Sequence, residues 1–148
     1  MIRYQITSHE PGSHYFDVSI QIDAPDPNGQ HLRLPNWIPG SYMIRDFARN
    51  LLDLQASSAD GELAIEQIDK SNWRVAAAQV AVTIEYKVYA KDLSVRAAHL
   101  DHSHGYFNGS SVFLEVVGQG DQPCEVLIEK PGAKYCEAWQ LATSLSRK

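Results

Sequence analysis

The chain has 148 residues, of which 44% are hydrophobic, and its formal net charge is −5. This length is typical of one domain that buries roughly 70% of its unfolded surface, so the composition argues against wholesale disorder. The acidic balance, without any basic run, argues against nucleic-acid binding and against an anionic membrane surface, and no apolar stretch is long enough to span a bilayer.

The first part of the chain alternates apolar and polar residues at Ile2–Ile6 and again from Phe16 to Ile22. A period of two places the apolar side chains on one buried face of a sheet, so both segments are predicted strands. Pro11 and Gly12, which lie between them, break a helix and predict a turn.

Residues 34–47 are apolar and aromatic but follow neither a helical nor a strand period. Pro35 and Pro39 remove backbone donors and Gly40 lets the chain turn, so this segment cannot be a central strand. We predict an ordered loop that packs through its large side chains, Trp37, Ile38, Tyr42 and Phe47.

Alternation returns in four further segments, which turn residues separate: Leu52–Ala56, Val80–Val88, Val112–Val116 and Cys124–Ile128. We therefore predict an all-β fold, an antiparallel β-sandwich or a curled open sheet, with at most one short helix. That helix is expected to be capped by Ser41 and to carry Ile44, Phe47 and Leu51 on one face.

Three imidazoles and a carboxylate fall within six positions, from His99 to His104. On a strand His102 and His104 would share a face, and with Asp101 they would suit a transition metal. A solvated loop with incidental histidines is the interpretation that we favour, so no metal ligand is assigned.

Two blocks of the sequence resemble the amino-terminal domain of the glycyl aminopeptidase family of zinc metallopeptidases. The first block is Leu34–Asn50, and the second is Asp92–Asp101 followed by Gly105–Leu114. Their order, and the strand-like stretch between them, match the family, so the resemblance covers nearly the whole chain.

The resemblance implies that residues 1–148 are the amino-terminal β domain of a larger metallopeptidase. Its gluzincin catalytic domain and PDZ-like domain lie downstream and are absent here, and zinc is expected in the missing catalytic domain. The nearest match to the zinc-binding His-Glu-x-x-His begins at His9 and Glu10, but its second histidine, His14, falls one residue late. We assign no catalytic residue and no cofactor to this chain, and we expect it to be inactive alone.

Tyr106-Phe107-Asn108-Gly109 is the segment to which we assign a functional role. Locally it predicts a strand that ends in a tight turn. By analogy with related two-domain aminopeptidases, it is expected to bind substrate: the rings crowd a pocket for small residues, and an asparagine amide accepts from an ammonium. The competing interpretation is a hairpin whose rings pack on the core.

Three functions remain open. The leading one is a non-catalytic domain that docks on the catalytic domain of a glycyl-aminopeptidase-like enzyme and forms part of the wall of its peptide-binding cleft. The second is a free-standing β-sandwich module that binds peptide or carbohydrate. The third is a small metal enzyme that uses the Asp101, His102 and His104 cluster.

The leading function implies an exposed apolar patch in the isolated chain. We expect Trp37, Ile38, Tyr42 and Phe113 to contribute to it, and a homodimer of the isolated chain to cover it. A start without a signal-peptide core and two cysteines read as thiols, Cys124 and Cys136, favour a cytoplasmic protein.

Overall fold

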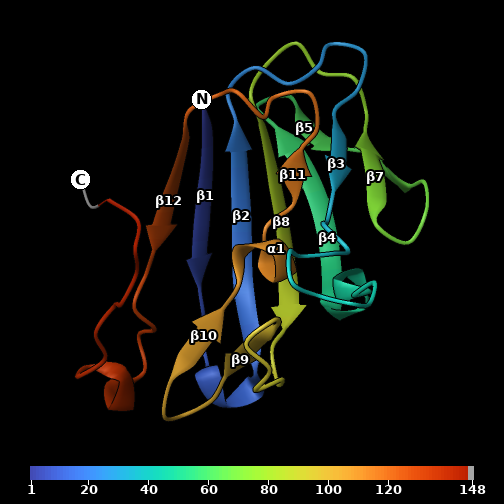
Figure 1. Cartoon of the computed structure of the whole chain (residues 1–148). Helices are drawn as coiled ribbons and strands as arrows, with labels where there is room; N and C mark the ends of the chain where they lie inside the picture. Colours follow the sequence, from blue (N-terminus) through green and yellow to red (C-terminus); the bar gives the residue numbers. More distant parts are fainter. Residues whose placement is uncertain (147–148) are drawn as a thin grey trace.

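The computed structural model describes residues 1–146, which form mostly strands (Figure 1). The strands of this part are β1 (Ile2–Thr7), β2 (Tyr15–Ile22), β3 (His31–Arg33), β4 (Leu51–Ser58), β5 (Gly61–Leu63), β6 (Ile65–Gln67), β7 (Asn72–Val75), β8 (Val82–Tyr89), β9 (Ala98–Leu100), β10 (Gly105–Phe107), β11 (Glu115–Val116) and β12 (Cys124–Ile128). The helical elements are α1 (Gly109–Val112) and the 3-10 turns η1 (Pro11–Ser13), η2 (Phe47–Asn50) and η3 (Lys134–Cys136). The predicted all-β fold with at most one short α-helix is confirmed.

The largest sheet has six strands in the order β12-β1-β2-β8-β4-β5. Its centre is the antiparallel pair β2 and β8, in which Ile20 lies opposite Ile84 and both are completely buried. Burying such a side chain stabilises the fold by roughly 1.5–3 kcal/mol. The alternation in the sequence therefore identifies these strands and the face of the sheet that lies inward.

Two smaller sheets share a core with the large one: β11-β3-β7-β6 and the hairpin β10-β9. In Figure 1, β3, β7 and β11 lie beside the upper end of the large sheet, and β9 and β10 lie at the lower end. The core joins residues of all three sheets, such as Ile84 of the large sheet, Trp73 of β7 and Leu100 of β9. This arrangement places the β9–β10 hairpin at one end of the molecule.

Two details of the large sheet differ from the expected antiparallel alternation. β12 pairs with β1 in parallel, so Ile2 lies opposite Cys124. β4 contains a bulge between Leu52 and Gln55, where Asp53 adopts a φ of 54°. The bulge ends the alternation and leaves Leu52 exposed, although the sequence predicts it to be buried.

The helix predicted from Ser41 is wrong. Residues before Phe47 form turns and irregular backbone, and the only helical piece there is η2. The predicted strand at Val112–Val116 is also only partly right, because Val112 ends α1 and pairing is limited to β11. The segment from Ser41 has no regular period that would fix its structure, whereas the short apolar run at Val112–Val116 fits a helix and a strand equally well.

Tyr86 of β8 fixes the segment after α1 against the sheet. Its hydroxyl donates to the Val112 carbonyl at 2.8 Å and accepts from the Leu114 amide at 3.1 Å. The side chain is buried, and desolvation raises the pKa of its phenol. This contact sets the position of α1 and of the β10 strand before it.

None of the helical segments among residues 1–146 is long and apolar enough to cross a membrane. Cys124 is an exposed thiol and Cys136 a buried one.

Candidate functional site

The segment Tyr106–Gly109 begins in β10, which pairs antiparallel with β9. Because successive side chains of a strand alternate, Tyr106 and Phe107 point to opposite faces. The Phe107 ring packs edge-on against Phe16 and Phe113, with centroids 5.5 and 5.7 Å away. Tyr106 is exposed, and its hydroxyl donates to the Val95 carbonyl at 2.7 Å.

Asn108 begins α1 instead of the tight turn that the sequence predicts. Its Oδ1 accepts from the Ser110 amide at 3.2 Å and from the Ser110 hydroxyl at 2.8 Å, which caps the helix. Its carbonyl accepts from the amide and the hydroxyl of Ser111. The half-buried Asn108 side chain therefore stabilises the first turn of α1 as its N-cap.

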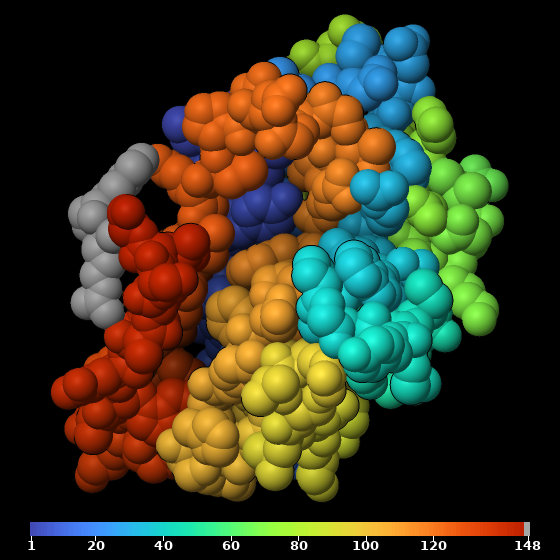
Figure 2. All heavy atoms as spheres, viewed as in Figure 1, coloured from blue at the N-terminus to red at the C-terminus, as the bar shows by residue number. Residues whose placement is uncertain are grey.

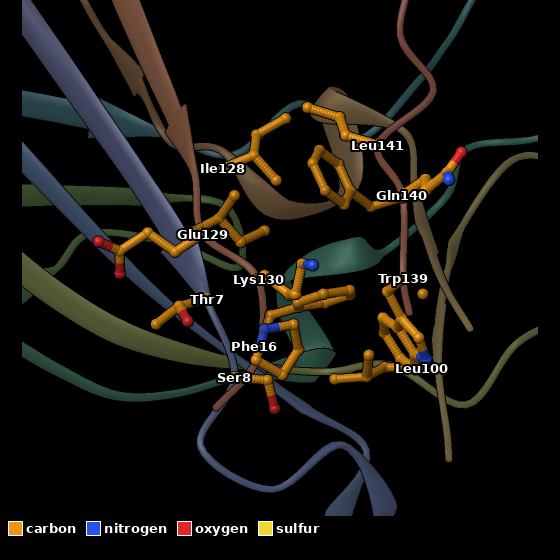
Figure 3. A pocket seen from close by; sticks show the side chains of 14 residues that line it. Thr7, Ser8, Phe16, Leu100, Ile128, Glu129, Lys130, Trp139, Gln140 and Leu141 are labelled. Atoms are coloured by element: carbon orange, nitrogen blue, oxygen red, sulfur yellow. The ribbon is translucent and has the colours of Figure 1, made fainter. Parts of the chain in front are cut away.

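An apolar pocket of about 280 Å³ lies between the sheet and the chain that follows β12 (Figure 3). Phe16 and Leu100 come from the sheet side, and Trp139 and Leu141 close the other side. Of the four assigned substrate-binding residues, Phe107 is the one that lines this pocket. The pocket has the size and the lining for an apolar side chain.

The segment that closes the pocket is held at its far end by a polar contact with η1. The Tyr135 hydroxyl donates to Glu10 Oε1. This hydrogen bond raises the pKa of Tyr135 to about 12 and lowers that of Glu10. Lys130 adds a bond within the segment, from Nζ to the Glu137 carbonyl at 2.8 Å.

The loop before η2 exposes the side chains that the sequence predicts to be packed. Tyr42 is fully exposed, Ile44 is 63% exposed, and Trp37 is half-exposed, while Phe47 alone is buried and Ile38 is partly buried. The loop keeps its shape by hydrogen bonds such as that from Trp37 Nε1 to the Ser41 carbonyl at 3.0 Å. It is therefore an ordered loop that leaves apolar surface uncovered.

Three segments join into one apolar face. Figure 2 shows the loop (cyan), the chain before β9 (yellow) and β10 with α1 (gold) adjoining on the side in view. The contacts agree, since η2 packs against α1 and Tyr106 bonds Val95. The large exposed side chains of this apolar face are Trp37, Tyr42, Met43, Ile44, Leu93, Val95 and Tyr106. Of the contributors predicted from sequence, Phe113 is half-buried and belongs to the core periphery.

The predicted cluster of Asp101, His102 and His104 is wrong in one member, because His99 and not His102 lies beside Asp101. His102 and His104 do not share a strand face, because both lie in the turn between β9 and β10. His102 turns toward the Tyr135 ring, with centroids 5.2 Å apart, whereas His99 and His104 both approach Asp101. The sequence signal for His99 is its place in β9, two residues before an aspartate that directly follows this strand, since side chains two residues apart on extended backbone share a face.

The His9–His14 segment forms the predicted turn, η1. His9 Nε2 lies 3.9 Å from Asp17, and His14 Nδ1 bonds the Leu100 carbonyl, so the two rings do not converge. These residues do not fit the zinc site of a peptidase.

Comparisons with known proteins agree with the resemblance seen in the sequence. The sequence model of the peptidase M61 N-terminal domain matches residues 3–148. The crystal structure of an aminopeptidase N family protein from Idiomarina loihiensis is similar over 100% of this chain, with 44% identity and a TM-score of 0.94. This chain covers 25% of that solved chain, so it spans a quarter of its length. No curated protein matches.

Proposed function

Since the chain belongs to the family of peptidase M61 N-terminal domains, we propose that it is the non-catalytic amino-terminal domain of a larger, glycyl-aminopeptidase-like zinc metallopeptidase. Its partner is the catalytic domain of that enzyme, which would supply the zinc. The single observation that carries the docking role is the apolar face. A domain that stands alone in solution rarely exposes so many large apolar side chains in adjoining segments.

The occupant of this face is the rest of a longer polypeptide. The similar chain from Idiomarina is about four times as long, and a contiguous exposed apolar patch marks an interaction site. Tyr42 and Trp37 are the residue types that dominate the binding energy of interfaces.

The same proposal gives the β10–α1 segment a place at the substrate cleft. Tyr106 belongs to the apolar face, and Asn108 lies two residues later, so a domain docked there would approach both. The Asn108 amide nitrogen would face a peptide carbonyl, while Oδ1 is used by the cap. We retain a cytoplasmic location as part of the proposal.

The apolar pocket supports the second candidate, a free-standing module that binds an apolar side chain of a peptide. Its lining from Phe16, Phe107 and Trp139 is the observation in favour. A carbohydrate is a poorer match, because sugar hydroxyls need more polar partners than this lining offers.

The experiment compares an isoleucine of the apolar face with an exposed isoleucine that is not part of it. Ile44, in the loop, is 63% exposed, and Ile68, in the turn between β6 and β7, is 53% exposed. In the isolated chain Ile44→Asp and Ile68→Asp should each change stability by less than about 0.5 kcal/mol. In the longer polypeptide with the catalytic domain, Ile44→Asp alone should lower Tm and the rate of glycyl-amide hydrolysis. Equal behaviour of the two variants there would favour the free-standing module.

A further inference from the structure

Three side chains with metal-binding atoms converge at the tip of the β9–β10 hairpin. His99 Nε2 lies 2.9 Å from Asp101 Oδ2, and His104 Nδ1 lies 3.7 Å from Asp101 Oδ1. One donor atom of each residue lies within 4.8 Å of the others. In a tetrahedral site with bonds of about 2.0–2.1 Å, ligand atoms are about 3.3 Å apart, so small side-chain movements would bring one oxygen of Asp101 and the two rings to the required spacing.

The carboxylate at the centre is held in place by its neighbours. Asp101 Oδ1 accepts from the Ser103 amide at 2.7 Å, the Ser103 hydroxyl at 2.6 Å and the His104 amide at 3.1 Å. The Ser103 hydroxyl also lies 2.8 Å from His104 Nδ1 and so links the carboxylate to the ring. Such outer contacts orient the ligands of known metal sites.

The two imidazoles differ in burial in a way that suits a bound ion. The His99 side chain is only 9% exposed, and its Nδ1 is buried without a hydrogen-bond partner. Nε2 is the ring nitrogen that faces Asp101, so it is the atom that would bind the ion, and Nδ1 would carry the proton of the ring. His104 is 54% exposed and leaves a side through which an ion and a water can enter.

We propose that His99, Asp101 and His104 bind a first-row transition metal ion, Zn²⁺ being the best match, with water in the open position. Two imidazoles and a carboxylate are the ligand types that zinc accepts in proteins. On binding, one metal–nitrogen bond forms to each ring, and the proton of each neutral imidazole stays on the ring nitrogen that does not bind the ion. This site is formed by residues of this chain alone and does not depend on the proposed function.

The test uses the chain without a histidine tag, stripped by a chelator and titrated with Zn²⁺ in a calorimeter. We expect one ion per chain and a rise in Tm. With Co²⁺, the visible absorption band of a low-coordinate site should appear.

The variants avoid the buried histidine, whose loss threatens folding. His104→Ala and Asp101→Asn should each lower zinc affinity about tenfold or more. His102→Ala, in the same turn but outside the cluster, is the matched control and should bind as the wild type does. Absence of zinc binding by the folded wild type, or equal losses in His102→Ala and His104→Ala, would overturn the proposal.

Discussion

The interior of the large sheet and the loop before η2 are both rich in large apolar side chains, but the sheet buries them and the loop leaves them exposed. On β8 every second residue is buried, and Ile84 is 0% exposed. In the loop Ile44 is 63% exposed and Tyr42 fully so. The difference teaches that apolar composition alone does not predict burial. A repeat that matches the period of a strand does, because it gives the side chains a common face.

The largest effect is expected from the two isoleucines that represent these regions. Ile84→Ala creates a cavity in the core and should cost about 2–5 kcal/mol of unfolding free energy. Ile44→Ala removes a side chain from the surface and should cost less than about 0.5 kcal/mol. Urea unfolding of both variants of the isolated chain measures the contrast. Comparable losses would show that the loop is part of the core.

Tyr86→Phe should have the next largest effect. It leaves the Leu114 amide and the Val112 carbonyl buried without their partner, at a cost of about 1–3 kcal/mol. Hydrogen exchange should show the Leu114 amide losing protection while the centre of β2 keeps its own. An unchanged Leu114 amide would mean that another group holds the α1–β11 segment.

The same contrast explains which parts of the fold the sequence predicts. Strict alternation predicts β1, β2, β8 and β12 nearly to their ends. The short strands β3 and β7 carry too few residues for a period to be visible, and their position depends on pairing with each other. The bulge at Asp53 likewise depends on the β4–β8 register, which local patterning does not encode.

The candidate site was predicted in part. The aromatic residues of β10 were identified as a strand, but Asn-Gly signals a hairpin turn and a helix cap equally well, and only the tertiary contacts of α1 decide between them. The pairing of His99 with Asp101 follows from β9 being a strand three residues long, too short to be recognised in advance. Trp139 of the pocket was missed because no periodic pattern surrounds it.

Asn108→Ala should lower stability moderately, and its effect on the specificity constant distinguishes a helix cap from a substrate contact. Loss of the cap should lower stability by about 0.5–2 kcal/mol. If the Asn108 amide nitrogen also donates to a substrate carbonyl, the specificity constant of the longer enzyme for glycyl amides should fall about two- to tenfold at a temperature where the variant is folded. A loss of stability with unchanged kinetics would retire the substrate contact and leave the docking face untouched.

The smallest effect is expected at alkaline pH. Burial, with smaller contributions from Cys124 and Glu115, raises the pKa of Tyr4 to about 12 from 10.0. A raised pKa in the folded state means that this contribution to stability is complete below about pH 10 and is lost as the pH rises towards 12. Tm should therefore fall less between pH 9.5 and pH 11 in Tyr4→Phe than in the wild type. An identical fall in both would show that Tyr4 ionises as freely in the folded chain as in the unfolded one.

The central claim is that the apolar face is covered by the rest of a longer polypeptide. Hydroxyl-radical footprinting tests it directly, because Trp37, Tyr42 and Met43 are reactive side chains that the isolated chain exposes. We predict that all three are labelled in the isolated chain and protected in the longer polypeptide with the catalytic domain, while Tyr135, exposed on the far segment, is labelled in both. Equal labelling of Trp37, Tyr42 and Met43 in the two proteins would contradict the account.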